Sequence, residues 1–249
     1  MIHLGFLFFV FLIIFLVNFP FGTWYTGWDN LHPEFNFCMN FWRALNAVWQ
    51  TNQGTGTYGG HGYAATLFHT LFLWVLSIII PLQYLRSLFT FFTLFVGGIG
   101  VFFLLRKILL ELTTSTRHTS SHSSLYKEEN NQYYTPLQKN EIVPIEKSRI
   151  HDSTIGTSSH NPRNDSLIDT ASLLAALYYM LNLATVQNFY IQLEAFIVHF
   201  AALPWLFFTL FVFLKNKTKK NLLIFAVVNL VASVQGFIPP LFFVYMILS

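Results

Sequence analysis

Two carboxylates, Asp29 and Glu34, are the only acids in the long stretch that follows the first apolar run. Trp24, Trp28 and His32 lie close to Asp29 in sequence, and burial beside aromatic rings makes a carboxylate a stronger base. Such a base can take the proton from an acceptor hydroxyl, so Asp29 is a candidate catalytic residue. The alternative is a structural role, in which Asp29 caps the turn formed by the residues after it.

Candidate substrate-binding residues follow in a glycine-rich stretch, QTNQGTGTYGGHGY, at residues 50–63. Its glycines are too frequent for a regular element and predict a loop whose backbone a ligand can approach closely. The polar residues of this region that we expect to contact a substrate are His32, Glu34, Asn52, Gln53 and His61.

Three charged residues elsewhere complete the predicted site. Arg43 and Arg86 are the only basic residues between the first apolar run and residue 105, and either could bind a phosphate or a lipid headgroup. Glu194 is the only acid after Asp169 and could face Asp29 across a cleft, where it would bind a sugar or a divalent ion. The alternative places Glu194 at the N-terminus of a helix in headgroup water.

The sequence predicts no cofactor and, beyond a divalent ion at Glu194, no metal. His118, His122, His151 and His160 lie in one polar segment, but their spacing matches no compact ligand set. The single cysteine, Cys38, cannot form an intramolecular disulfide and is expected to be an unpaired thiol. The net charge of +3 does not indicate nucleic-acid binding, because the basic residues cluster beside apolar segments.

The elements that must position these residues are membrane helices. Hydrophobic residues make up 54% of the chain and charged residues only 10%, against about 25% in soluble domains. Sixteen of the 25 charged side chains lie between Arg106 and Asp169, which leaves the flanking regions almost uncharged. A soluble fold is therefore excluded, and membrane lipids are the expected surroundings.

Six apolar stretches are followed by a seventh that begins at residue 239 and runs to the end of the chain. Because the seventh stops inside an apolar run, we expect the chain to be a fragment. Residues 113–169 are rich in Ser, Thr, Asn and His and are expected to be disordered. The six stretches are residues 4–19, 64–80, 82–105, 172–183, 195–214 and 222–234.

Basic residues at the ends of the stretches predict the orientation. Arg106 and Lys107 end the third stretch and four lysines follow the fifth, so both ends are placed in the cytoplasm. If residues 64–80 do not cross, the N-terminus is cytoplasmic, loop 21–81 is extracytoplasmic and loop 106–170 is cytoplasmic. If they do cross, the N-terminus lies outside, and the charge distribution alone does not separate the two topologies.

Local patterns favour the first topology. Thr66, His69, Thr70 and Ser77 share one stripe of a helix over residues 64–80, which is typical of an interfacial or re-entrant helix. An amphipathic helix is also expected over residues 40–53, lying along the outer surface of the bilayer.

Two stretches are too short to cross a bilayer. Residues 172–183 and 222–234 reach roughly 18–20 Å as helices, against a hydrocarbon core of about 30 Å. Each is followed by polar or helix-breaking residues, so the pattern predicts broken helices, which often border a binding cleft.

The order of these features resembles the N-terminal part of GT-C fold glycosyltransferases, and most closely the large cell-wall α-(1→3)-arabinofuranosyltransferase-like group. These polytopic enzymes use polyprenyl-phosphate sugar donors and carry an essential acid in the first external loop. The resemblance covers residues 1–112 and 170–249. It rests on Asp29, RALNAVWQTNQGTGTYGGHGY (residues 43–63), the short helix before Pro81, the spanning helix that closes with RK, and LPW (residues 203–205). The insert at residues 113–169 has no counterpart in that family.

The predicted fold is all-α: a polytopic transmembrane helical bundle with an amphipathic or re-entrant helix on its outer face. Residues 1–112 form an N-terminal membrane region with an anchor helix, residues 113–169 a cytoplasmic loop, and residues 170–249 an incomplete set of membrane helices. The resemblance implies a glycosyltransferase of the cell membrane, or its N-terminal fragment, with Asp29 as the base. It would move sugar from a polyprenyl-phosphate donor to an extracytoplasmic glycan or lipid acceptor. The alternative is a non-enzymatic multi-pass transporter or assembly subunit.

Overall fold

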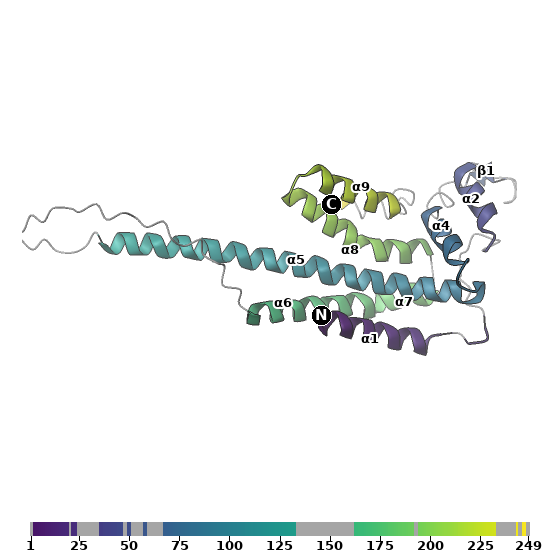
Figure 1. Cartoon of the computed structure of the whole chain (residues 1–249), viewed down its shortest axis with the longest axis horizontal. Coiled ribbons are helices and arrows are strands. Elements are labelled where there is room, and N and C mark those ends of the chain that lie inside the picture. The colour runs from purple at the N-terminus through teal and green to yellow at the C-terminus, as the bar shows by residue number, and fades with distance from the viewer. Residues whose placement is uncertain are drawn as a thin grey trace, which may run out of the picture. The chain divides into compact units, whose positions relative to one another are not determined.

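The computed structural model is helical, as the sequence predicts (Figure 1). It describes residues 2–19, 21–23, 35–46, 49–50, 57–58, 67–132, 162–191, 194–232, 243 and 246–247. The helices are α1 (Ile2–Val17), α2 (Phe37–Asn46), α4 (Leu67–Leu76), α5 (Leu82–Gln132), α6 (Pro162–Leu181), α7 (Leu183–Ile191), α8 (Glu194–Lys215) and α9 (Lys219–Val231). Two short antiparallel strands, β1 (Trp49–Gln50) and β2 (Thr57–Tyr58), place Trp49 opposite Tyr58.

The chain forms two compact units. One consists of Met1–Arg106 together with Asp169–Ser249, and the other is Lys107–Ile168. The first unit contains the helices that carry the candidate functional site.

Two helices of the described residues are long and apolar enough to cross a membrane. They are Leu82–Ser115 within α5 and Phe196–Lys215 within α8. A third segment qualifies if α6 and α7 form one span, since Asn164–Leu181 and Leu183–Tyr190 pass the same criterion together with a bend of 45° between them. The composition predicts membrane helices, and the structure confirms that two or three segments of the described residues are long and apolar enough to cross a membrane.

The bend between α6 and α7 is stabilised by the side chains of Asn182 and Thr185. Asn182 Nδ2 donates to the carbonyl oxygens of Tyr178 (3.1 Å) and Tyr179 (3.0 Å) near the end of α6, and Thr185 Oγ1 donates to the same Tyr179 oxygen at 2.7 Å. The Thr185 backbone N–H donates to Asn182 Oδ1 at 3.0 Å and so caps the start of α7. The sequence predicts a break here, but α6 begins at Pro162 and is longer than the stretch at residues 172–183 suggests.

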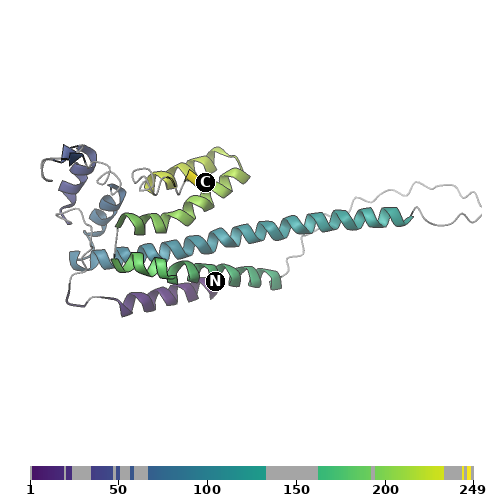
Figure 2. The same cartoon turned by 180° about the vertical axis from the view of Figure 1, so that it is seen from behind.

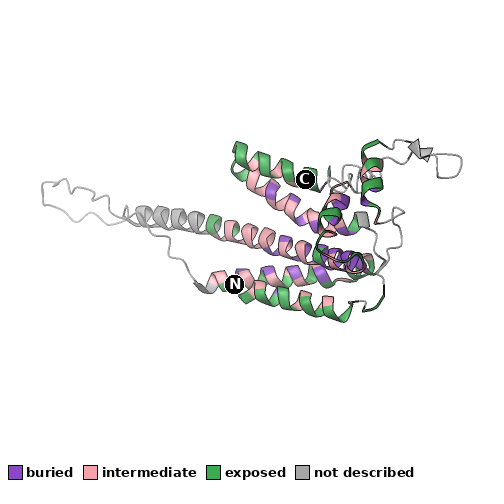
Figure 3. Cartoon of the chain, turned by 45° about the vertical axis from the view of Figure 1, so that its right-hand side comes forward, coloured by how far each residue is buried: buried purple, intermediate pink, exposed green. Residues whose placement is uncertain are grey.

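The core of the first unit draws on several helices. Leu7 of α1, Leu85 of α5 and Ile197 of α8 are 0% exposed, and Met180 of α6 is 1% exposed. Figure 3 shows that α1 is otherwise largely exposed, which suits a helix with one side toward lipid.

Small residues let α5 approach its neighbours closely. A Cβ atom at Gly97 would lie 2.6 Å from the ring of Phe200 on α8, and one at Gly98 would overlap the Met180 side chain on α6. Without side chains at these positions the helix backbones come close together, which is the usual way that membrane helices associate.

The third glycine makes room for a hydrogen bond. A Cβ atom at Gly100 would lie 2.9 Å from Trp205 Nε1, and that indole nitrogen donates to the carbonyl oxygen of Val96 on α5 at 3.0 Å. The indole therefore joins α8 to α5 at a place that only a glycine leaves open.

Aromatic rings attach α1 to α5. Phe11 stacks on Phe95 with ring centroids 4.7 Å apart, and Phe15 meets Phe91 edge-on at 5.6 Å. Figure 2 shows α1 and α5 running in nearly parallel directions, with α6 between them in that view.

In the second unit, regular structure extends into the polar segment that we expected to be disordered. Helix α5 continues to Gln132, and α6 begins at Pro162. Thr113 Oγ1 donates back to the carbonyl oxygen of Leu110 at 2.9 Å, and Lys107 pairs with Glu111 one turn on at 3.1 Å. An established helix extends at little cost, so such local bonds suffice to carry it past the apolar run.

Candidate functional site

Most of the predicted polar site lies outside the described residues. For Glu194 the structure gives only its place as the first residue of α8. The predicted site residues that lie outside the described residues are Asp29, His32, Glu34, Asn52, Gln53 and His61. Their roles therefore stay predictions.

The amphipathic helix predicted over residues 40–53 is found as α2, earlier in the chain and shorter. Its start is fixed by Asn36 Oδ1, which accepts from the Met39 backbone N–H at 3.1 Å. Arg43 is half-buried on this helix, and Trp42 is 59% exposed, which suits an interfacial helix. The sequence did not predict that the helix ends at Asn46, because the apolar spacing continues beyond this residue.

Helix α4 has ten residues and ends in a turn over residues 77–80 before Pro81. Ten residues span only about 15 Å, so α4 by itself is too short to cross a bilayer. It packs against α2, where the rings of Phe41 and Trp74 lie 6.1 Å apart. The helix predicted over residues 64–80 is thus present in part, and residues 64–66 lie outside the described chain.

Arg86 lies near the start of α5 and begins a band of buried polar side chains. Arg86 is 3% exposed, and Ser87, Thr90 and Thr93 are 0%, 2% and 5% exposed. Thr93 Oγ1 donates to the Thr90 carbonyl oxygen at 2.7 Å, whereas Ser87 Oγ has no hydrogen-bond partner among the described residues. A buried charge and hydroxyls inside an apolar helix are expensive, so this band is the best candidate for a functional role on α5.

His69 of α4 meets this part of α5. Its ring is 9% exposed and lies 4.3 Å, centroid to centroid, from the ring of Phe89, which is one turn after Arg86. His69 was predicted only as part of a polar stripe, and the structure turns it inward.

Beside His69 and Phe89 there is an open groove of about 440 Å³ between α4, α5, α8 and α9. Small-ligand sites have volumes of roughly 300–1,000 Å³, so the groove is large enough to hold one. Among the described residues that line it there is no Asp, Glu, Lys or Arg, and only His69 and Thr93 are polar apart from the indole of Trp205. The lining residues are Phe68, His69, Phe72, Phe89, Phe92, Thr93, Val96, Val198, Ala201, Ala202, Trp205, Val227, Val228, Val231 and Ala232.

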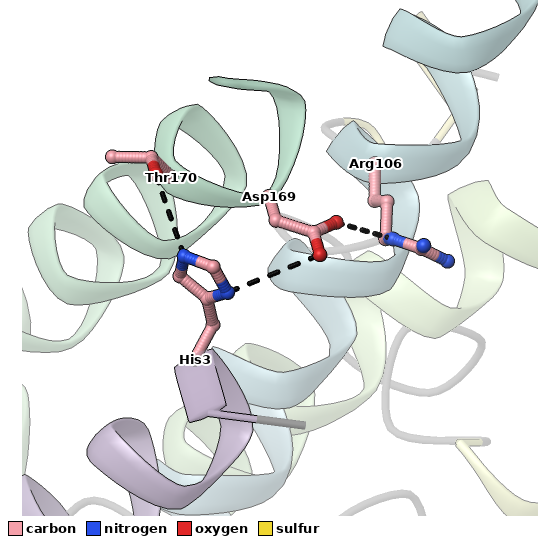
Figure 4. Close-up of polar contacts among 4 residues, drawn as sticks. All are labelled: His3, Arg106, Asp169 and Thr170. Atoms are coloured by element: carbon pink, nitrogen blue, oxygen red, sulfur yellow. Dashed lines mark hydrogen bonds and ion pairs between the residues drawn. The ribbon is translucent and has the colours of Figure 1, made fainter. Parts of the chain in front are cut away.

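A second polar cluster, the His3 cluster, joins α1, α5 and α6 (Figure 4). Arg106 Nε donates to Asp169 Oδ1 at 2.6 Å, and His3 Nδ1 lies 3.9 Å from Asp169 Oδ2. His3 Nε2 is 3.4 Å from the Thr170 hydroxyl. Sequence reasoning missed this cluster, although a lone histidine in an apolar helix and an acid just before an apolar run were both visible.

The described residues hold no group of three or more His, Cys, Asp or Glu side chains that could bind a metal ion. The part of the chain given by the structure therefore offers an apolar groove with a buried cation near it, rather than a complete catalytic centre.

Fold and site together define a helical protein with two or three segments able to cross a membrane. No protein-family model, curated protein or solved structure matches the chain. The likeness to GT-C glycosyltransferases therefore rests on the sequence features alone.

Proposed function

We propose that the chain is a multi-pass protein of the cell membrane and a GT-C type glycosyltransferase, or the N-terminal part of one. It transfers a sugar from a polyprenyl-phosphate donor to an extracytoplasmic acceptor. The observation that supports this best is the length of α4, which is ten residues. A helix of about 15 Å is too short to cross by itself, which supports a connection between α1 and α5 that stays on one side of the membrane.

The topology follows from that length and from the basic residues. With Arg106 and the lysines after α8 in the cytoplasm, the N-terminus is cytoplasmic and loop 21–81 is extracytoplasmic. This loop presents Asp29 at the outer surface, where an external acceptor and a lipid-linked donor can meet.

Three residues have assigned roles in this proposal. Asp29 takes the proton from the acceptor hydroxyl, and Arg43 or Arg86 binds the donor phosphate. The position of Arg86 supports its role, since it is 3% exposed on an apolar helix and ionisable side chains buried in membrane helices are often functional.

The test is transfer from a lipid-linked sugar by the full-length gene product in membranes. Asp29→Asn keeps the shape and removes the base, so transfer should fall by about 10²–10⁴-fold. Asp152→Asn, an acid of the polar segment, is the matched control and should transfer normally. Undiminished transfer by Asp29→Asn would remove Asp29 from the mechanism.

A non-enzymatic transporter or assembly subunit is the second candidate. The observation that favours it is the lining of the groove, which among the described residues contains no Asp or Glu. If residues 64–80 crossed the membrane, the loop that holds Asp29 would be cytoplasmic, which is the arrangement this candidate prefers.

A further inference from the structure

The groove between α4, α5, α8 and α9 has walls of two kinds. Helices α4 and α5 contribute mainly aromatic side chains, Phe68, Phe72, Phe89 and Phe92 among them, whereas α8 and α9 contribute mainly valine and alanine. Among the described residues neither wall carries an Asp, Glu, Lys or Arg, and the hydroxyl of Thr93 already donates within its own helix. A polar or charged ligand would lose its hydration in this groove and gain few hydrogen bonds in return.

The mouth of the groove opens to the surroundings of the helices. Phe72, Phe92 and Val231 line the groove and are still 42%, 47% and 55% exposed. Such a surface in water would be a large apolar patch, but two of the four helices, α5 and α8, contain the candidate membrane spans.

The depth of the groove indicates what enters it. Its α5 residues run from Phe89 to Val96, which places them roughly 10–21 Å along the helix from Leu82, where the span begins. In a bilayer whose hydrocarbon core is about 30 Å thick, this range lies among lipid tails and away from headgroups.

We propose that the groove holds one acyl chain of a bilayer phospholipid, which lies between the aromatic and the aliphatic wall. The inference rests on the membrane part of the proposed function and is independent of sugar transfer. The bound chain fills the space between α4 and α9 and thereby connects the two walls of the groove.

The experiment uses the protein in phosphatidylcholine nanodiscs that contain a small fraction of phosphatidylcholine with a diazirine in the middle of one chain. After illumination, mass spectrometry locates the adducts. We expect them mainly on groove residues such as Phe92 and Val228. Ala202→Phe should lower labelling of the groove by about tenfold, because excluding even two methylenes costs that much binding.

Ala226→Phe is the matched control, since Ala226 is exposed on α9 and does not line the groove. It should leave groove labelling unchanged. Val228→Phe enters from α9, a different helix of the aliphatic wall, and should reproduce the loss, which covers the case in which Ala202→Phe disturbs folding.

Two results would overturn the proposal. One is labelling spread evenly over all exposed apolar faces, including that of α1, and insensitive to Ala202→Phe. The other is displacement of the label by polyprenyl phosphate but not by excess phosphatidylcholine. That result would show that the groove binds an isoprenoid chain and not an acyl chain. Because the readout is an adduct, failure here is distinguishable from failure of the transferase proposal.

Discussion

The ion pair between Arg106 and Asp169 joins α5 to α6 across 63 positions of sequence. The Asp169 side chain is 22% exposed and that of Arg106 is 42% exposed, so water weakens the attraction but does not abolish it. His3 Nδ1 lies 3.9 Å from the second carboxylate oxygen of Asp169, so the start of α1 also contacts this carboxylate. A few polar atoms thus join the start of α1 to interior positions of α5 and α6.

We expect the pair to contribute a measurable coupling energy. Asp169→Asn and Arg106→Gln, alone and combined, form a double-mutant cycle for the free energy of unfolding in detergent, followed by circular dichroism. The coupling should be about 0.5–1 kcal/mol, the upper part of the range for exposed pairs. Lys107→Gln with Glu111→Gln is the reference cycle within one helix and should give about 0.3–0.5 kcal/mol. Additive losses at Arg106 and Asp169 would show that the contact does not stabilise the protein.

At the scale of elements, α5 is the helix around which the first unit is organised. Helices α6 and α8 pack closely against its glycines, and the phenylalanines of α1 stack on its phenylalanines. Its N-terminal half carries the buried polar band. The spacing of small residues could have indicated this in advance, because Gly97, Gly98 and Gly100 are the only glycines between residues 64 and 249 except Gly156 and Gly236.

A methyl group at these glycines should therefore destabilise the helix packing. Gly100→Ala sets a Cβ 2.9 Å from Pro204 Cβ, a rigid neighbour, and should cost about 1–3 kcal/mol of unfolding free energy. Gly5→Ala is the control, since nothing lies within 4 Å of its added Cβ, and should be neutral or stabilise by about 0.5–1 kcal/mol. Equal stability of the two variants in detergent unfolding would refute the close approach of α5 and α8.

At the scale of the whole molecule, the number of crossings decides where the predicted catalytic loop lies. The single thiol offers a direct measurement, since Cys38 is exposed on α2. A membrane-impermeant maleimide should label Cys38 in intact cells if loop 21–81 is extracytoplasmic. The control is Lys217→Cys in a Cys38→Ser background, which should be labelled only after permeabilisation. Labelling of Cys38 only after permeabilisation would favour the transporter or assembly subunit.

The sequence predicted the helical class and the positions of α5, α8 and α9, because a long apolar run has few other ways to satisfy its backbone in lipid. It did not predict where α5 ends or α6 begins, since Thr113 and its neighbours extend a helix by local bonds that leave no apolar period. The sequence could not predict the groove, for a different reason. Its lining comes from four helices, and only their packing brings Phe89, Trp205 and Val228 to the same groove. The roles of Asp29 and Glu194 stay predictions.

A groove whose rim includes Phe72, Phe92 and Val231 is entered sideways, from within the bilayer. Its occupancy then follows the mole fraction of a lipid in the membrane and not the amount of protein or lipid per volume of buffer. Diluting a vesicle suspension should leave the bound fraction unchanged, whereas fusing the same vesicles with an excess of foreign lipid should replace the occupant.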